Sequence, residues 1–223
     1  MRRRIAVISL FCSILYGQVA KDANERYQTH DGREAVAKGL GASDRDQRQK
    51  PAELVRTMDL RPGMTVADIG TGVGYMLPFL SKAVGAQGHV VAEDIFDDFL
   101  AQAKTRTSQD GLTNVTFVKG TEHAPQLAEN SVDVALALDS YHHYDYPADM
   151  LAGLHKGLKP GGRLVIVEYY KSKTAMPGGN ALQHIRLDKP ELIKEVESNR
   201  FRLLSSHDHI PASQYMVVFQ RLD

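Results

Sequence analysis

The chain alternates between two patterns of hydrophobic and polar positions. Short runs rich in valine, isoleucine, leucine and alanine are separated by longer segments in which apolar residues recur every three or four positions. The first pattern is typical of strands buried on both faces, and the second of helices that pack against them. We expect strands at residues 65–69, 88–95, 115–118, 131–138 and 163–169, then an antiparallel pair at 201–207 and 214–221. We expect helices at 51–58, 75–84, 97–107, 148–158 and 189–199.

This order of elements predicts an α/β fold. Strands that alternate with helices form a mostly parallel sheet covered on both faces, so we expect a doubly wound sheet of seven strands whose last strand is antiparallel. The 223 residues suffice for one such domain, and no internal repeat or low-complexity stretch interrupts it. We assign residues 50–223 to this domain. Residues 21–49 are polar and weakly periodic, and we expect a loosely structured lead-in segment with one short helix.

Residues 1–20 differ from the rest of the chain. Three arginines come first, an apolar run covers residues 5–17, and Ala20 offers a cleavage point. The pattern is typical of a secretory signal peptide and too short for a comfortable transmembrane helix, although Gln18 stands where a small residue is usual. Cleavage would place the protein in the periplasm or outside the cell, without stable membrane insertion. The alternative is an uncleaved anchor or an N-terminal amphipathic helix, on a membrane-anchored or cytoplasmic protein.

Composition narrows the range of partners. Lysine and arginine number 27, as do aspartate and glutamate, so the net charge is zero, and a chain cleaved after Ala20 would carry −3. No overall positive field favours nucleic acid, and we expect no nucleic-acid partner. The single cysteine, Cys12, lies in the apolar run, so a cleaved chain has no disulfide, no thiolate nucleophile and no cysteine-bound zinc. These numbers do not indicate an oligomeric state.

The most informative motif is the run V-A-D-I-G-T-G-V-G, in which an apolar strand ends in alternating glycines. Gly70, Gly72 and Gly74 allow a sharp turn with positive φ and the close approach of a ligand to the backbone. Asp68, two residues before the first glycine, can face an ammonium group or hydroxyls. The dinucleotide fingerprint G-x-G-x-x-G needs a glycine where Tyr75 stands. A plain turn is the alternative interpretation of these glycines, which Asp68 and the position between a strand and a helix disfavour.

The spacing D-x-G-x-G-x-G resembles motif I of class I S-adenosylmethionine-dependent methyltransferases. Further matches are R-D-x-x-Q-K-P at 45–51, L-D-S-Y-H-H at 138–143 and L-x-P-G-G-x-L at 158–164, so the resemblance covers roughly residues 45–205. Together with the N-terminal signal, they are similar to a bacterial subgroup of uncharacterised class I methyltransferases. The resemblance implies a Rossmann-like methyltransferase fold and S-adenosyl-L-methionine as the cofactor.

The resemblance also implies roles for residues at the carboxyl ends of the strands, where open α/β sheets bind ligands. Asp68 and the glycine loop hold the methionine part and position the sulfonium. Asp94, 24 residues after Gly70, binds the ribose, and Ile95 lies against adenine. A helix N-cap is the alternative role for Asp94.

The contact with the adenine edge is open. Members of the family often carry an acid directly after the glycine that follows the third strand, and Thr121 occupies this place, followed by Glu122 and His123. Any of the three is a candidate. The full set of expected cofactor-binding residues is Asp68, Gly70, Thr71, Gly72, Gly74, Tyr75, Asp94, Ile95, Thr121, Glu122 and Asp139.

Candidates for catalysis follow the fourth expected strand. The resemblance places Asp139 and Tyr141 next to the transferable methyl group. His142 is the first candidate for a general base, with Tyr141 and His143 behind it, and a base is needed only if the acceptor arrives protonated. The alternative is that this aromatic stretch only packs over the sheet. We expect no metal site, because the pair of histidines at 207 and 209 has no third ligand at a familiar spacing.

We therefore expect methyl transfer from S-adenosylmethionine to a small-molecule acceptor, since the sequence shows no additional substrate domain. Placing the nucleophile in line with the methyl carbon and the sulfur would be the protein's main contribution, because the cofactor is already activated. A non-catalytic protein that binds S-adenosylmethionine or S-adenosylhomocysteine is one alternative. A nicotinamide-dependent oxidoreductase is another, which Tyr75 disfavours.

Overall fold

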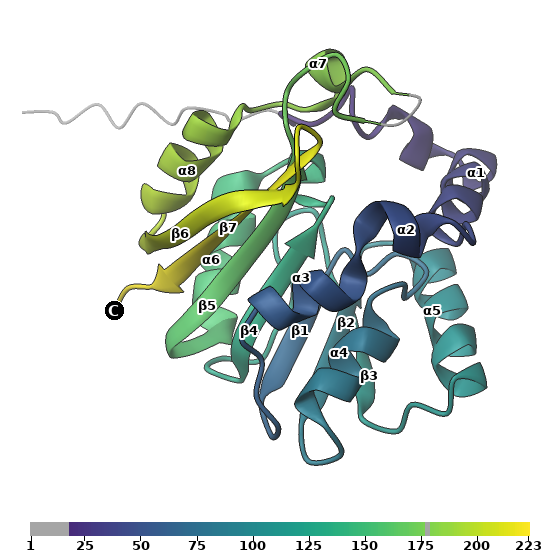
Figure 1. Cartoon of the computed structure of the whole chain (residues 1–223), viewed down its shortest axis with the longest axis vertical. Helices are drawn as coiled ribbons and strands as arrows, with labels where there is room; N and C mark the ends of the chain where they lie inside the picture. Colours follow the sequence, from purple (N-terminus) through teal and green to yellow (C-terminus); the bar gives the residue numbers. More distant parts are fainter. Residues whose placement is uncertain (1–17, 177–178) are drawn as a thin grey trace, which may run out of the picture.

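The computed structural model describes residues 18–176 and 179–223, so most of the expected signal or anchor at residues 1–20 lies outside the described residues. The described chain forms a seven-stranded sheet with the order β3-β2-β1-β4-β5-β7-β6 (Figure 1). The strands are β1 (Thr65–Ile69), β2 (His89–Asp94), β3 (Val115–Lys119), β4 (Val132–Leu138), β5 (Leu158–Tyr169), β6 (Phe201–Ile210) and β7 (Gln214–Arg221).

The sheet is mostly parallel. Strands β1 to β5 all pair in parallel, whereas β7, the last strand of the chain, runs antiparallel to both of its neighbours, β5 and β6. The predicted doubly wound sheet with an antiparallel last strand is therefore confirmed.

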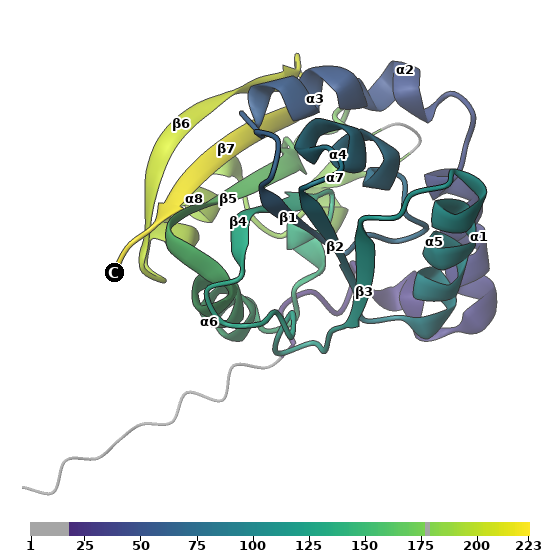
Figure 2. The ribbon, with the colours of Figure 1, turned by 90° about the horizontal axis from the view of Figure 1, so that it is seen from below.

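Helices cover both faces of the sheet, as Figures 1 and 2 show. Helices α3 and α4 pack on one face together with the inner side of α5, and α6 and α8 pack on the other. The helices are α1 (His30–Leu40), α2 (Arg45–Gln49), α3 (Pro51–Thr57), α4 (Leu77–Val84), α5 (Asp97–Gln109), α6 (Pro147–Gly157), α7 (Ala181–His184) and α8 (Lys189–Glu197), with short 3-10 helices at Glu25–Gln28 and Tyr141–His143.

Strand β4 shows why the central runs are almost wholly apolar. Successive residues of a strand point to opposite faces, and here both faces are covered. Val134 and Leu136 join the core under α3 and α4, while Ala135 and Ala137 join the core under α6 and α8. All four are fully buried.

Two elements begin two or more residues away from the expected position. Helix α4 begins at Leu77 rather than at residue 75, because the turn of the glycine loop continues to Met76. Strand β5 begins at Leu158, which pairs with Val132, and not after the P-G-G turn. The turn residues form an irregularity within the strand, where Gly161 has a φ of +73°.

The lead-in is more ordered than its sequence suggests, and the expectation of one short helix is wrong. It contains a 3-10 helix, the eleven-residue α1 and the five-residue α2. The side chain of Thr29 caps α1 by accepting a hydrogen bond from the backbone N–H of Gly32. Ala37 packs against Val73 and Phe99 of the main domain. This tertiary contact compensates for the weak apolar pattern of the segment.

The site follows from the topology of the sheet. The chain runs outward from β1 through β2 to β3 and then returns to place β4 on the other side of β1. Open α/β sheets bind ligands at the carboxyl ends of the strands beside such a reversal. Among the described helices, none has the length and apolarity needed to cross a bilayer.

Candidate functional site

A large cavity lies at the carboxyl ends of β1, β2 and β4, beside the reversal of strand order. Its empty volume is about 860 Å³, including the space at its mouth. The lead-in forms one wall, and the loops after the strands form the others. Among the residues that line it are Asn24, Tyr27 and Arg45, then Gly70, Thr71 and Gly72, then Glu93, Asp94, Ile95 and Phe96, then Thr121 and Glu122, and finally Asp139, His143, Tyr144 and Asp145.

The glycine loop is shaped by two close approaches. Gly70 has a φ of +72°, and a Cβ there would lie 2.8 Å from the Cβ of Ser140. Gly72 has a φ of +55°, and its Cβ would lie 2.9 Å from a methyl group of Leu40 in α1. Glycine is the residue that accepts both the conformation and the contact. The predicted positive φ angles of the loop are confirmed.

Backbone N–H groups of the loop are tied to two acids of β2. Gly70 donates to Glu93 Oε2 at 3.2 Å, and Gly72 donates to Asp94 Oδ2 at 2.8 Å. Asp68 lies behind the loop and accepts a hydrogen bond of 2.7 Å from the hydroxyl of Thr71. These bonds hold the loop against the sheet and orient both acids of β2.

Burial makes the acids of this site reluctant to ionise. The pKa values of Asp68 and Asp94 are each raised to about 6, chiefly by desolvation. The pKa of Glu93 is raised well above its ordinary value by desolvation and by the nearby charge of Asp94. One carboxyl oxygen of Glu93, Oε1, is buried and has no hydrogen-bond partner among the described residues. A bound donor or cation at this place would satisfy that oxygen.

Asp139 directly follows β4 and lines the cavity. Its φ is +51°, an uncommon conformation for a residue other than glycine. Its Oδ1 accepts a hydrogen bond of 2.6 Å from the side-chain amide of Gln214, whose own oxygen accepts one of 3.0 Å from Gln49. Desolvation, followed by the charge of Glu168, raises the pKa of Asp139 to about 8.

The R-D-x-x-Q-K-P segment forms α2 and the start of α3, next to the cavity. Arg45 is 8% exposed, lies 3.9 Å above the ring centre of Tyr75 and donates to the carbonyl of Leu40 at 2.8 Å. The hydroxyl of Tyr75 donates to Asp46 at 2.9 Å. Gln49 makes the bond to β7 described above. The segment thus places one guanidinium at the wall of a cavity whose acidic lining residues include Glu93, Asp94 and Asp139.

One end of the cavity is aromatic. Tyr27 stacks on Phe96 with ring centres 5.8 Å apart and approaches His143, whose Nε2 lies 3.3 Å from the tyrosine hydroxyl. His143 Nδ1 donates to the side-chain oxygen of Asn24 at 2.8 Å. Burial raises the pKa of Tyr27 to about 12, so its hydroxyl stays protonated and remains a donor.

Comparisons with known proteins agree with this geometry. Residues 67–166 match the family described as the methyltransferase domain. A crystal structure of an S-adenosylmethionine-dependent methyltransferase from Aquifex aeolicus superposes with a TM-score of 0.79 at 26% identity, covering 84% of this chain and 98% of that one. The matched domain belongs to the S-adenosylmethionine-dependent methyltransferases.

Other relatives of this methyltransferase match over shorter stretches. The UbiE ubiquinone/menaquinone biosynthesis C-methyltransferase of Shewanella sp. strain ANA-3 is 31% identical over 50% of this chain, and the match covers 45% of its own length. The chain thus spans under half the length of that curated relative. The [4+2]-cyclase SpnF superposes with a TM-score of 0.68 at 18% identity over 82% of this chain and 85% of that one, which is a likeness of fold alone.

The cavity of this methyltransferase fits S-adenosylmethionine. The cofactor supplies an activated methyl group on a positively charged sulfur, together with a ribose diol and the charged ends of methionine. The unpaired oxygen of Glu93 is an acceptor for a hydroxyl donor. The buried acids suit a cation, and Arg45 suits a carboxylate. Gly70, Thr71 and Gly72 bring the backbone of the loop to the wall of the cavity.

Most of the sequence-predicted residues of the methyltransferase come together in this cavity. Three of the others lie behind its wall: Asp68 under the loop, Gly74 between α4 and α5, and Tyr75 under Arg45. The predicted residues that line it are Gly70, Thr71, Gly72, Asp94, Ile95, Thr121, Glu122, Asp139 and His143.

The remaining two, Tyr141 and His142, do not line it. The hydroxyl of Tyr141 donates to Glu195 of α8 at 2.6 Å, and His142 Nδ1 donates to the buried Glu168 at 2.7 Å. Both face a smaller cavity that Ile185 also lines. Their catalytic role stays a prediction.

Several lining residues of the methyltransferase were missed by the sequence reasoning. Asn24 and Tyr27 lie in a polar stretch without a clear period, and no spacing connects them to the glycine loop. Glu93 precedes the predicted ribose-binding Asp94, and only the structure shows that both face the cavity. Arg45 is the first residue of the R-D-x-x-Q-K-P motif, and this motif was the sequence signal that could have identified it.

Proposed function

We propose that this chain transfers the methyl group of S-adenosylmethionine to a small-molecule acceptor. The observation that carries the proposal is the composition of the cavity wall. A glycine loop with positive φ angles lies there beside three acidic residues, Glu93, Asp94 and Asp139. This lining has the charge and hydrogen-bonding capacity that a sulfonium cofactor with a ribose diol requires.

The charge of the lining favours this cofactor over a nicotinamide dinucleotide. A pyrophosphate carries negative charge, and its usual site leaves the backbone N–H groups of the glycine loop free to bind it. Here the N–H groups of Gly70 and Gly72 already donate to carboxylates. A phosphate at the loop would face those acids at close range, whereas a sulfonium would be attracted by them.

The cofactor's orientation in this proposal follows from the order of the lining residues. Glu93 and Asp94 accept hydrogen bonds from the ribose hydroxyls. Ile95, Thr121 and Glu122 lie on the adenine side. The glycine loop and Arg45 hold the methionine part, and Asp139 lies near the sulfonium. This arrangement keeps the predicted roles of the loop, Asp94 and Ile95.

The acceptor would occupy the aromatic end formed by Tyr27, His143 and Tyr144. Both reactants share one cavity, which the lead-in and the loops after the strands line. The cofactor would occupy much of that cavity, so the remaining part suits a small molecule. The name of the relative UbiE, a C-methyltransferase of ubiquinone and menaquinone biosynthesis, makes a carbon acceptor of that kind one to include in a screen.

Calorimetric titration of the purified chain with S-adenosylmethionine, S-adenosylhomocysteine and NAD tests the cofactor. We expect one equivalent of each sulfur ligand to bind and NAD to show no heat. Binding of NAD without either sulfur ligand would contradict the proposal. Transfer of a labelled methyl group to a panel of oxygen, nitrogen, sulfur, carbon and metalloid acceptors tests catalysis. Tight binding without turnover across the panel would favour the non-catalytic alternative.

We also propose that residues 1–20 direct export and are then removed, which their sequence pattern supports. Cleavage after Ala20 would remove two hydrogen bonds of 3.2 Å to Asp145, in which the backbone N–H of Val19 donates to its carbonyl and that of Ala20 to its carboxylate. Asn24, whose side chain donates to this carboxylate at 3.1 Å, would remain. Mass spectrometry of the chain from cell fractions should find a periplasmic or secreted form that begins at Lys21. An intact chain in the membrane or the cytoplasm would contradict this.

A further inference from the structure

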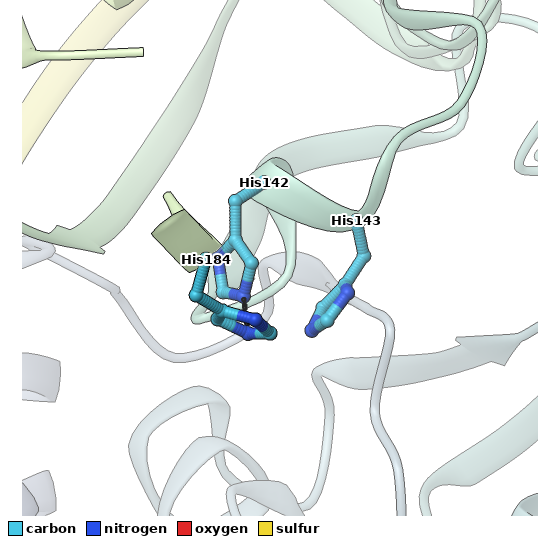
Figure 3. Close-up of side chains that lie close together, drawn as sticks. All are labelled: His142, His143 and His184. Carbon is cyan, nitrogen blue, oxygen red and sulfur yellow. Dashed lines mark hydrogen bonds between the residues drawn. The ribbon is translucent and has the colours of Figure 1, made fainter. Parts of the chain in front are cut away.

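Three histidines from two distant segments meet beside the aromatic end of the cavity. His142 and His143 belong to the 3-10 helix after β4, and His184 ends α7. One ring nitrogen of each lies within 4.8 Å of one ring nitrogen of both others, and His142 Nε2 and His184 Nε2 are 3.1 Å apart. Figure 3 shows the three imidazole rings gathered around one point.

Two of the rings are oriented from behind by oxygen acceptors. His142 donates its Nδ1 proton to Glu168, a carboxylate that is 1% exposed, at 2.7 Å. His143 donates its Nδ1 proton to the amide oxygen of Asn24 at 2.8 Å. In both rings the proton therefore sits on Nδ1, and Nε2 carries the lone pair. Metal-binding histidines are held in this way by carboxylate or carbonyl oxygens.

We propose that His142, His143 and His184 form a binding site for a divalent transition metal of the Zn²⁺ type, with a position open to an exogenous ligand. Three imidazole nitrogens are a known ligand set for zinc. Tetrahedral bonds to zinc of about 2.0–2.1 Å place ligand nitrogens about 3.3 Å apart. The pair at 3.1 Å is already near this spacing, and a rotation of His143 brings in the third.

The surroundings of the cluster agree with metal binding. Arg186, which lines the small cavity beside His142, forms a two-bond ion pair with Glu195 at 2.5 and 2.9 Å, and this pair offsets its positive charge. Behind the site, the buried carboxyl group of Glu168 is the acceptor for His142 Nδ1.

The open position connects the metal to the proposed function, on which this part of the inference rests. His143 lines the cofactor cavity, so a ligand on the metal would lie at its aromatic end. An acceptor hydroxyl or thiol bound there loses its proton to water and becomes anionic near neutral pH. Its oxygen or sulfur then forms the bond to the methyl carbon, while the carbon–sulfur bond of the cofactor breaks and its electron pair stays on that sulfur. The Tyr27 hydroxyl, now 3.3 Å from His143 Nε2, is a donor for that anion.

Metal titration of the chain without a polyhistidine tag tests the site. The protein is stripped with a chelator and titrated with Co²⁺, whose visible spectrum reports coordination, and then with Zn²⁺ in competition, all without S-adenosylmethionine. We expect one equivalent to bind, with an absorption typical of four-coordinate nitrogen ligation. His184→Ala removes the ligand on the short helix α7 and should weaken binding at least roughly 100-fold. Glu168→Gln should weaken binding by about 10–100-fold, as loss of an orienting partner does.

His89→Ala is the matched control, because His89 begins β2 at the opposite end of the sheet, where its side chain hydrogen-bonds to Thr116. It should bind metal as the wild type does. Circular dichroism of the metal-free variants shows whether each one folds. If His184→Ala does not fold, His142→Gln provides a second variant that lacks one ligand. Wild-type protein that takes up no stoichiometric metal, or ligand variants that bind as tightly as His89→Ala, would show a cluster that is only hydrogen-bonded.

The result is separable from the proposed function. Failure to bind metal in a chain that still binds S-adenosylhomocysteine and transfers methyl groups would overturn the metal site alone. Metal binding in a chain that binds no sulfur cofactor would support the site and overturn the proposed function.

Discussion

Two residues that line the cavity have positive φ for different reasons. Gly70, at +72°, has no side chain and sits against Ser140, where any Cβ would clash. Asp139, at +51°, carries a side chain that Gln214 holds in place, so the surrounding contacts maintain its unusual backbone. Such conformations cluster at functional sites because the rest of the fold supplies the energy to hold them.

Gly70→Ala should lower both stability and cofactor affinity. The left-handed backbone alone costs about 1–2 kcal/mol for alanine, and the new Cβ would push Ser140 and distort the loop. We expect affinity for S-adenosylhomocysteine, measured by calorimetry, to fall at least roughly tenfold, which is about 1.4 kcal/mol.

Gly63→Ala is the matched control for this change. Gly63 has a φ of +88°, but a Cβ there would meet nothing within 4 Å, and it lies in the turn before β1. It should lower the free energy of unfolding by about the same backbone cost and leave the affinity unchanged. Equal cofactor affinity in the two variants would contradict the assignment of the loop.

Asp139 should make the preference for S-adenosylmethionine over S-adenosylhomocysteine depend on pH. With its pKa raised to about 8, the carboxyl is mostly protonated at neutral pH and ionises as the pH rises, and only the ionised form attracts a sulfonium. The charged groups that act on it are Glu168 from β5 and Arg45 and Arg48 from α2. The ratio of the two affinities should therefore rise between about pH 6.5 and 9, by up to about tenfold per unit below the pKa.

The ratio isolates this effect, because both ligands share the same amino and carboxyl groups and differ in the charge on sulfur. Asp139→Asn should give a lower ratio that does not change with pH. A wild-type ratio that stays constant across this range would place the sulfonium away from Asp139.

Among the elements, α2 connects the lead-in to the far side of the sheet. Gln49, at its end, donates to Gln214 of β7 at 3.0 Å, and Gln214 donates to Asp139. Gln49 and Gln214 are 4% and 1% exposed. Removing Gln49 therefore leaves a buried amide without its partner.

Gln49→Ala should reduce the free energy of unfolding by about 1–3 kcal/mol, the cost of an unsatisfied buried polar group. Gln47→Ala, on the exposed side of the same short helix, is its control and should change stability by less than about 0.5 kcal/mol. Chemical denaturation followed by circular dichroism measures both. Equal stability of the two variants would show that the chain of amides contributes nothing to the fold.

The elements also show what the sequence can predict. The strands of the sheet were predictable because strands that are covered on both faces, such as β4, consist almost wholly of apolar residues. The glycine loop was predictable because only glycine accepts both its backbone conformation and its close contacts. Helix α1 was not, because Gly32 and Gly39 interrupt its pattern and its stability comes from contacts with the main domain. His184 could not be connected to His142, since 42 residues separate them and only the fold brings them together.

At the scale of the whole molecule, the site is shared between the sheet and the lead-in. Asn24, Tyr27 and Arg45 form one wall of the cavity, and the loops after the parallel strands form the rest. Figure 1 shows the lead-in and α7 lying at the same end of the sheet. A ligand in the cavity therefore contacts both parts and should hold them together.

S-adenosylhomocysteine should accordingly protect the lead-in. At about 100 times its Kd, a ligand of the native state adds about 2.7 kcal/mol to the free energy of unfolding. The ligand should also suppress local opening of residues 25–49. We expect the helices of this segment to open while the sheet stays folded, and a ligand that contacts both parts opposes such opening. Hydrogen exchange followed by mass spectrometry should show marked slowing there and little local change in β6, which lies at the edge of the sheet away from the cavity. Equal effects in both segments would mean that the lead-in does not close over the ligand.

The most direct test of the account is a crystal structure of the chain grown with S-adenosylhomocysteine. We predict the ligand in the cavity after β1, β2 and β4, with its ribose hydroxyls on Glu93 and Asp94 and its sulfur toward Asp139. Density for the ligand at another place, or a glycine loop closed against it, would contradict the central claim.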